Sequence, residues 1–289
     1  LGMEYGDRIA VYMDNSCEAV VGIFAILKAD CIFLVINPTT KKEKLSFILN
    51  NCRAKGIITQ KGKLNTVKSA CGSVPSIKFM VASGLKDTEE QSSTAETGES
   101  GTFSMETLTS QMPDSIPERK TIDIDLASLI YTSGSTGNPK GVMMTHQNMV
   151  SASTSITTYL ENREDDIILN VLPLSFDYGL YQVIMAAQFS GTVVLEKSFL
   201  YPYAVINLLK AEKVTGFPIV PTISAILLQM KELKNENFEH LRYITNTAAA
   251  LPVSHITGLR EIFPKAKIYS CLLYTSDAAD EGLGVDLGG

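Results

Sequence analysis

The chain has 289 residues, of which 45% are hydrophobic and 19% charged, and its formal net charge is −6. This apolar content is enough for a sizeable buried core, which excludes an intrinsically disordered protein. The acidic balance, without any block of Lys or Arg, argues against a nucleic-acid partner, which requires a basic surface.

The cysteines are odd in number and show no CxxC spacing: Cys17, Cys31, Cys52, Cys71 and Cys271. We therefore expect neither a disulfide framework nor a zinc site, and we expect a cytoplasmic protein. The most apolar stretch, residues 19–36, is interrupted by two charged residues. It predicts a buried helix followed by a buried strand, and no membrane span.

The first sixty residues alternate between strand and helix patterns. We expect strands at 8–13, 31–36 and 56–59, and helices at 16–28 and 42–51. Ser16 is the expected N-cap of the first helix. Alternation of this kind is typical of a parallel α/β layer.

Residues 83–120 differ in character, because 86–104 is rich in Ser, Thr, Glu and Gly and has no apolar period. We expect a polar surface loop or linker here. It separates a first α/β lobe, at 1–82, from a second α/β lobe, at 121–270.

The second lobe again alternates between strands and helices. The expected strands are 126–131, 142–144, 167–172, 192–195, 217–220 and 243–246. The expected helices are 145–160, with Thr145 as its cap, and 178–189, 202–210 and 224–231.

The C-terminal residues 271–289 continue neither pattern. Translated back into codons, this segment resembles the adapter of transposase-made sequencing libraries, read in frame. We expect it to be a non-native tail, with natural sequence ending near Ser270.

The most informative stretch is TSGSTGNPKG at 132–141, which directly follows an expected buried strand. Its glycines permit turns that bring backbone N–H groups close to a phosphate, its hydroxyls can donate hydrogen bonds, and Lys140 supplies a positive charge. It is not a Walker A loop, because Pro139 precedes the lysine and Gly141 follows it. The expected phosphate-binding residues are Thr132, Ser133, Gly134, Ser135, Thr136, Gly137 and Lys140.

This loop resembles the phosphate-binding signature of the adenylate-forming superfamily, which includes acyl- and aryl-CoA synthetases, adenylation domains of peptide synthetases, and luciferases. The similarity covers residues 2–270 and includes GDRIAV at 6–11, AILKA at 25–29 and Asn37-Pro38. It implies part of the large N-terminal domain of such an enzyme, with layered parallel sheets flanked by helices. Within the loop, it marks Thr136 and Lys140 as the catalytic residues.

The same resemblance assigns a pocket for the acid and the adenine. LPLSFDYG at 172–179 is similar to the segment whose aromatic or His residue gates the acid pocket, and Phe176 holds that place. YITNTAAALP at 243–252 resembles the segment that lines the adenine and acyl sites, with Thr247 and Ala248 where a glycine pair is usual. Asp30 replaces another glycine of the family. The implied pocket residues are Phe176, Asp177, Tyr178, Asn246, Thr247, Ala248 and Ala249.

Asp177 has more than one interpretation. In amino-acid-activating relatives an Asp at this place pairs with the substrate ammonium, whereas CoA ligases usually carry an apolar residue. A solvated loop residue or a helix N-cap are the alternatives.

The implied reaction uses ATP and Mg²⁺ to form an acyl-AMP and pyrophosphate, and then passes the acyl group to CoA or to the phosphopantetheine of a carrier protein. The partners are thus a small carboxylic acid and one of these thiols. The family's Tyr-Gly-x-Thr-Glu segment and C-terminal lysine are expected beyond Ser270, so we expect no metal ligand in this chain and no turnover by residues 1–289. An amino-acid adenylation domain and a non-catalytic nucleotide-binding protein remain as alternatives to an acid–CoA ligase.

Overall fold

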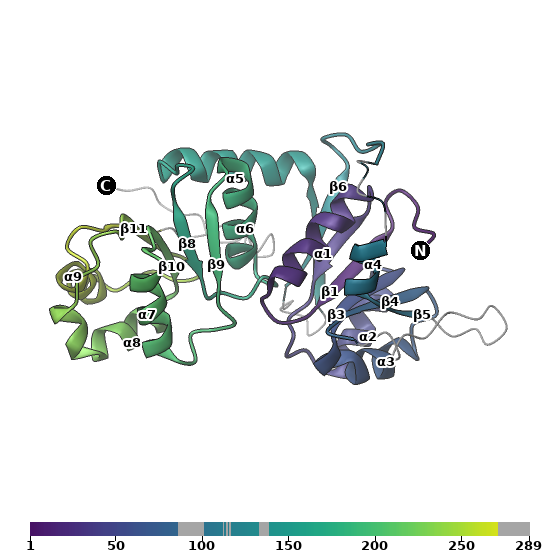
Figure 1. Cartoon of the computed structure of the whole chain (residues 1–289), viewed down its shortest axis with the longest axis horizontal. Coiled ribbons are helices and arrows are strands. Elements are labelled where there is room, and N and C mark those ends of the chain that lie inside the picture. Colours follow the sequence, from purple (N-terminus) through teal and green to yellow (C-terminus); the bar gives the residue numbers. More distant parts are fainter. Residues whose placement is uncertain (86–100, 112, 114, 116, 133–138, 271–289) are drawn as a thin grey trace, which may run out of the picture.

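The computed structural model describes residues 1–85, 101–111, 113, 115, 117–132 and 139–270. Within these residues the chain forms two β-sheets with helices on both faces (Figure 1). The expected α/β class with layered parallel sheets is confirmed.

The first sheet, sheet A, lies in the N-terminal half of the chain. Its strands are β1 (Arg8–Tyr12), β2 (Ile32–Val35), β3 (Gly56–Gln60), β4 (Phe79–Ser83), β5 (Gly101–Ser104), β6 (Leu126–Thr132) and β7 (Lys140–Thr145). Their order is β5-β4-β3-β1-β2-β6-β7, and only β6 and β7 pair antiparallel. The helices between them are α1 (Cys17–Lys28), α2 (Lys42–Asn51), η1 (Lys61–Lys63), α3 (Leu64–Cys71) and α4 (Met105–Gln111).

The second sheet, sheet B, is parallel throughout. Its strands are β8 (Ile167–Asn170), β9 (Thr192–Leu195), β10 (Gly216–Ile219), β11 (Tyr243–Asn246) and β12 (Lys267–Ser270), in the order β12-β11-β10-β8-β9. The helices of this half are α5 (His146–Tyr159), α6 (Asp177–Phe189), α7 (Pro202–Ala211), α8 (Pro221–Gln229), η3 (Lys231–Asn235) and α9 (Val253–Ile262).

Among the described residues, three hydrophobic cores pack the helices against the two sheets. One core packs α2 and α3 on the outer face of sheet A, and another packs α7, α8 and α9 on the outer face of sheet B. The third lies between the sheets and joins α1 and α6 to both of them. Alternation along β1 explains this arrangement, because Ile9 and Val11 face the middle core while Ala10 and Tyr12 face the outer one.

Both predicted helix caps are confirmed. The Ser16 hydroxyl accepts a hydrogen bond from the Ala19 N–H, 3.2 Å away, at the start of α1. Thr145 and Asn148 form a reciprocal capping box at the start of α5. Each cap satisfies N–H groups that the first helical turn leaves without partners.

The polar segment that we expected as a loop contains regular structure. β5 adds a parallel strand to the edge of sheet A, and α4 follows it directly. The prediction of a loop through residue 104 is wrong, since residues 101–104 form β5. The strand could not be recognised in the sequence because its buried residues include the polar Thr102 and Ser104, which leave no apolar period. In addition, β6 and β7 complete sheet A, so sheet membership does not follow the expected boundary at residue 120.

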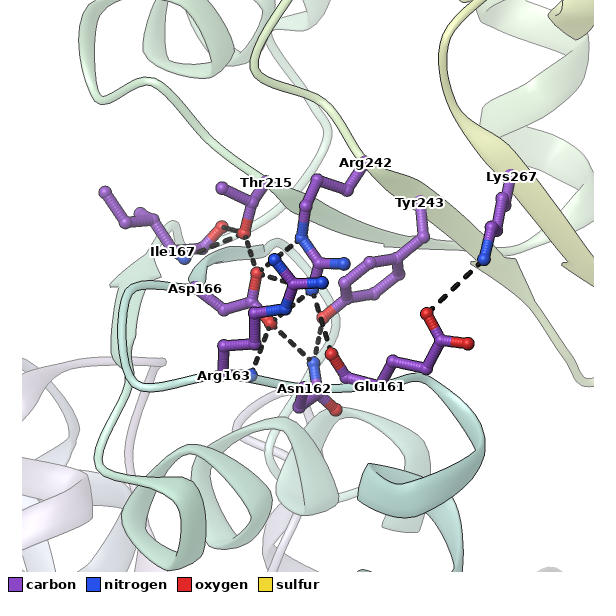
Figure 2. A network of polar contacts seen from close by, with 9 residues as sticks. All are labelled: Glu161, Asn162, Arg163, Asp166, Ile167, Thr215, Arg242, Tyr243 and Lys267. Carbon is purple, nitrogen blue, oxygen red and sulfur yellow. Dashed lines mark hydrogen bonds and ion pairs between the residues drawn. The ribbon is translucent and has the colours of Figure 1, made fainter.

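A polar network ties together the amino ends of three strands of sheet B (Figure 2). The Asp166 carboxylate, whose side chain is 1% exposed, pairs with the Arg242 guanidinium at 2.6 Å. It also accepts hydrogen bonds from the Thr215 hydroxyl at 2.7 Å and from the Asn162 amide at 3.1 Å. Because these residues immediately precede or flank β8, β10 and β11, the network stabilises the amino edge of sheet B. The carboxyl edge of the sheet takes no part in it.

Candidate functional site

The topology of both sheets predicts a ligand site at their carboxyl edges. In sheet A, β1 continues into α1 in the middle layer, while its neighbour β3 continues to α3 in the outer layer. In sheet B, β8 continues to α6 in the middle layer, while its neighbour β10 continues to α8 in the outer layer. Ligands of open α/β sheets bind where the loops after neighbouring strands diverge in this way.

Asn15 joins the two carboxyl edges to each other. It lies between β1 and α1, and its amide Nδ2 donates to the carbonyl of Leu172 at 2.8 Å and to that of Glu196 at 3.1 Å. Its Oδ1 accepts from the Leu174 N–H at 3.0 Å. The loops that follow β8 and β9 are therefore held against the loop that follows β1, so the carboxyl edges of the two sheets are adjacent.

The expected phosphate-binding loop begins at this same edge. Thr132 and Lys140 face each other across the β6–β7 pair, with Thr132 half-buried and Lys140 exposed. Since β6 runs parallel to β2, and β2 lies beside β1, the end of β6 is two strand spacings, roughly 10 Å, from the end of β1. The remaining loop residues, Ser133, Gly134, Ser135, Thr136 and Gly137, lie outside the described residues, and the phosphate-binding and catalytic roles stay predictions.

The segment expected to gate an acid pocket forms the loop after β8 and the first turn of α6. Phe176 is the N-cap residue of α6 and is 56% exposed. The interpretation of Asp177 as the N-cap is therefore wrong: it is the first helical residue, half-buried, and its carboxylate accepts from the Tyr178 N–H at 2.8 Å. Burial, followed by the nearby Asp177 charge, raises the pKa of Tyr181.

Two internal contacts shape this loop. Asn170 donates from Nδ2 to the Gly179 carbonyl at 3.0 Å and accepts from the Leu172 N–H at 3.1 Å. A side chain at residue 179 would collide with the carbonyl oxygens of Leu172 and Pro173, so only glycine permits this close approach. The loop conformation thus follows from its own sequence as well as from Asn15.

The second expected pocket segment, at the end of β11, lies beside the first. The Tyr178 hydroxyl and the Thr245 hydroxyl are 2.6 Å apart, which joins α6 to β11. Asn246 donates from Nδ2 to the Ala249 carbonyl at 2.9 Å, while Ala248 and Ala249 are exposed. The structure therefore places Tyr178 in contact with Thr245, near the end of β11, while the assignment of both segments to one pocket stays a prediction.

Buried polar atoms without a protein partner gather at this edge. Among the described residues they include Ser175 Oγ, Asn246 Oδ1 and Thr247 Oγ1. Buried polar groups are normally hydrogen-bonded, so atoms left open at a strand's carboxyl end are suited to a polar ligand such as a nucleotide base. In contrast, the residues that the structure describes hold no group of three or more His, Cys, Asp or Glu side chains that could bind a metal ion.

Sequence reasoning missed Asn15, Asn170 and Thr245. Each is polar and lies in the last two residues of a strand or within three residues beyond it. That position was the available signal, because a polar side chain there is near the carboxyl edge of a parallel sheet. Their partners could not be predicted, since Asn15 bonds to residues about 160 to 180 positions away.

Asp30 and Ala248, which the sequence resemblance places where the family usually has glycine, have left-handed backbone conformations. Ala248 has φ of 73° and Asp30 has φ of 54°. The Asp30 carboxylate accepts hydrogen bonds from the N–H groups of Lys120 and Thr121, both at 3.1 Å, so the aspartate anchors the irregular segment that leads to β6. Ala248 has no comparable compensation, because its methyl group cannot hydrogen-bond.

We expect Ala248→Gly to raise the free energy of unfolding by about 0.5–1 kcal/mol. An L-residue in this region costs about 1–2 kcal/mol, part of which is offset because glycine makes the unfolded chain more flexible. Urea titration measures the difference, with Ala249→Gly as the matched control, since Ala249 is not among the residues with positive φ. Equal destabilisation by both substitutions would contradict the strain at residue 248.

Comparison with known proteins identifies the protein family of this chain. The family model described as AMP-binding enzyme matches residues 1–272, so the chain belongs to this family. Its relatives include both acid–CoA ligases and peptide synthetases. It is 26% identical to 4-coumarate–CoA ligase CCL1 of Humulus lupulus, over 93% of this chain and 48% of that protein. It is 28% identical to gramicidin S synthase 2 of Brevibacillus brevis, over 90% of this chain and 5% of that protein.

Solved structures support the same fold. The anthranilate CoA ligase AuaEII in complex with anthranoyl-AMP superimposes with a TM-score of 0.83 at 24% identity, over 92% of this chain and 50% of that one. VinN in complex with L-aspartate superimposes with a TM-score of 0.73 at 26% identity, over 92% and 62%. The chain thus spans half or less of the relatives CCL1, gramicidin S synthase 2 and AuaEII. Among the described helices, none has the length and apolar character needed to cross a bilayer.

Proposed function

We propose that this chain is part of an ATP-dependent ligase that converts a carboxylic acid to its acyl-AMP and then transfers the acyl group to CoA or a carrier-protein phosphopantetheine. One observation carries the proposal: three segments lie at the carboxyl edges of the two sheets, and Asn15 bonds the loops after β8 and β9 to the end of β1. The segments are Thr132 at the end of β6, the 172–179 loop after β8, and residues 245–249 at the end of β11. A phosphate-type loop, an acid-gating segment and a polar base pocket are the three parts that adenylation requires. We place the enzyme in the cytoplasm, where CoA and carrier proteins are found.

In the proposed reaction a carboxylate oxygen attacks the α-phosphorus of ATP, the bond to the bridging oxygen breaks, and pyrophosphate leaves with that electron pair. The Thr132–Lys140 loop would bind the β- and γ-phosphates, with Lys140 offsetting negative charge on the leaving group. Catalysis then consists of positioning and charge stabilisation. Mg²⁺ would arrive on the ATP phosphates, as it commonly does, and the described residues offer no protein-only cage for it.

The base and the acid would lie on opposite sides of the Tyr178–Thr245 contact. Asn246 and Thr247 offer oxygen atoms without protein partners, suited to the exocyclic amine of adenine. Phe176 and Tyr178 would line the acid site, where their aromatic rings exclude water from the mixed anhydride.

The test is acid-dependent exchange between ATP and pyrophosphate by the full-length protein, with 4-coumarate, anthranilate, a long-chain fatty acid and L-amino acids as candidate acids. We expect one of these classes of acid to raise the rate of ATP–pyrophosphate exchange at least about tenfold over the rate without acid. The same assay on residues 1–289 should give no turnover. Binding of ATP without exchange for any acid would instead favour a non-catalytic nucleotide-binding protein.

Asp177 favours a second candidate, an amino-acid adenylation domain. Its carboxylate is half-buried at the start of α6, where it can pair with a substrate ammonium. In that case L-amino acids would support exchange and Asp177→Asn would abolish it. Exchange with a fatty or aryl acid that survives this substitution would retain the CoA-ligase proposal.

A further inference from the structure

Asn15 has a role that its position in sequence does not suggest. It lies in the connection between β1 of sheet A and α1, yet its three side-chain hydrogen bonds go to loops that follow strands of sheet B. Two of those bonds reach Leu172 and Leu174, in the loop that ends at Phe176 and Asp177. The residue itself is 8% exposed, so water competes little for these bonds.

The chemistry of the partners fixes the orientation of the amide. Leu172 and Glu196 present carbonyl oxygens, which require N–H donors, and Leu174 presents an N–H, which requires an acceptor. Only an amide offers two donors and an acceptor on one short side chain. A carboxylate of the same shape would accept from Leu174 but would place an oxygen against two carbonyls.

We infer that Asn15 is a positioning residue for the acid pocket: it clamps the 172–177 loop to the end of β1 and thereby sets where Phe176 and Asp177 stand relative to the carboxyl edge of sheet A. This inference rests on the proposed function. Asn15 makes none of its side-chain hydrogen bonds to the 246–249 segment, so we expect adenine binding to depend on the clamp less than acyl binding does. Its loss therefore weakens recognition of the acyl group more than that of AMP.

The geometric part is tested by amide hydrogen exchange on the whole chain. We expect Asn15→Asp and Asn15→Ala to speed exchange of amides in 172–177 by about tenfold or more, with no comparable change at the amino edge of sheet B. Asp166→Asn is the matched control, because it removes a buried polar anchor at the opposite edge. Unchanged exchange in 172–177, or acceleration that is equal throughout sheet B, would overturn the inference.

The functional part uses titration with AMP and with non-hydrolysable sulfamoyl-adenosine analogues carrying 4-coumaroyl, anthraniloyl or decanoyl groups. For the analogue that wild type binds best, we expect Asn15→Asp to weaken affinity about tenfold while AMP affinity changes by less than about threefold. Asp166→Asn, measured where it remains folded, should change neither. Tight binding of the analogue by wild type and Asn15→Asp alike would overturn the positioning role alone. Failure of wild type to bind any analogue would overturn the proposed function and, with it, this role.

Discussion

Replacement of Asp166 by Asn is expected to lower the free energy of unfolding by about 3 kcal/mol. The carboxylate is almost fully buried and pairs with Arg242, whose side chain is 30% exposed. Removing one partner of a buried pair costs about 3–5 kcal/mol, because the other charge is left uncompensated. The lower end applies here, since water can still reach part of the guanidinium. Thr215 and Asn162 lose an ionic acceptor as well.

Urea unfolding measures this effect, with Glu161→Gln as the matched control. Glu161 pairs with Lys267 at 3.4 Å at the same end of sheet B, but both side chains are at least 60% exposed. An exposed pair contributes only about 0–1 kcal/mol. Similar stabilities for the two variants would show that the buried network does not anchor the sheet.

The same pair predicts a pH dependence. Burial acts to raise the pKa of Asp166, but the hydrogen bonds from Arg242, Asn162, Thr215 and the Arg163 N–H outweigh it and hold the pKa below its ordinary value. A depressed pKa means that the unfolded chain binds the proton more readily. The stabilisation is therefore present above the ordinary aspartate pKa, near 4, and is lost as pH falls through the lower folded value. Asp166→Asn should remove this part of the acid destabilisation.

Elements with strong local signals could be predicted from the sequence. α2, β9 and β11 have the expected bounds, because apolar periodicity and flanking turn residues mark both ends. α3, β4, α9 and β12 were not predicted. α3, α9 and β12 mix polar and apolar side chains over short spans, so tertiary packing decides their structure. β4 is a short apolar run, FMVAS, which periodicity alone does not distinguish from a buried helix segment; its pairing with β3 and β5 makes it a strand.

The residues of the candidate site also fall into those that the sequence could predict and those that it could not. Phe176, Tyr178 and Asn246 could be named because they lie in recognisable segments. Asn15 could not, because its bonds reach across the two sheets and carry no local pattern. Asp30 shows the limit most clearly: only the structure shows that it has a left-handed backbone conformation and that its carboxylate holds residues 120–121.

Lys140→Ala in the full-length protein is expected to lower kcat for acid-dependent ATP–pyrophosphate exchange by about 10²–10³-fold, the usual loss when a single group that stabilises developing charge is removed. Lys140 lies at the start of β7, opposite Thr132, and is exposed at the mouth of the hairpin, so its removal should leave the core intact. The proposed role in offsetting charge on the departing pyrophosphate predicts a larger effect on kcat than on the KM of the acid.

Lys267→Ala is the matched control, because Lys267 is an exposed lysine at the first residue of β12, at the opposite, amino edge of sheet B. The Lys267→Ala variant should catalyse ATP–pyrophosphate exchange at nearly the wild-type rate. Lys140→Arg should recover part of the lost rate, since it restores the charge but not the compact ammonium geometry. If the kcat of Lys140→Ala for ATP–pyrophosphate exchange lies within about threefold of the wild-type value, Lys140 has no catalytic role. The hydroxyls and backbone N–H groups of residues 132–137 would then be the groups that hold the leaving pyrophosphate.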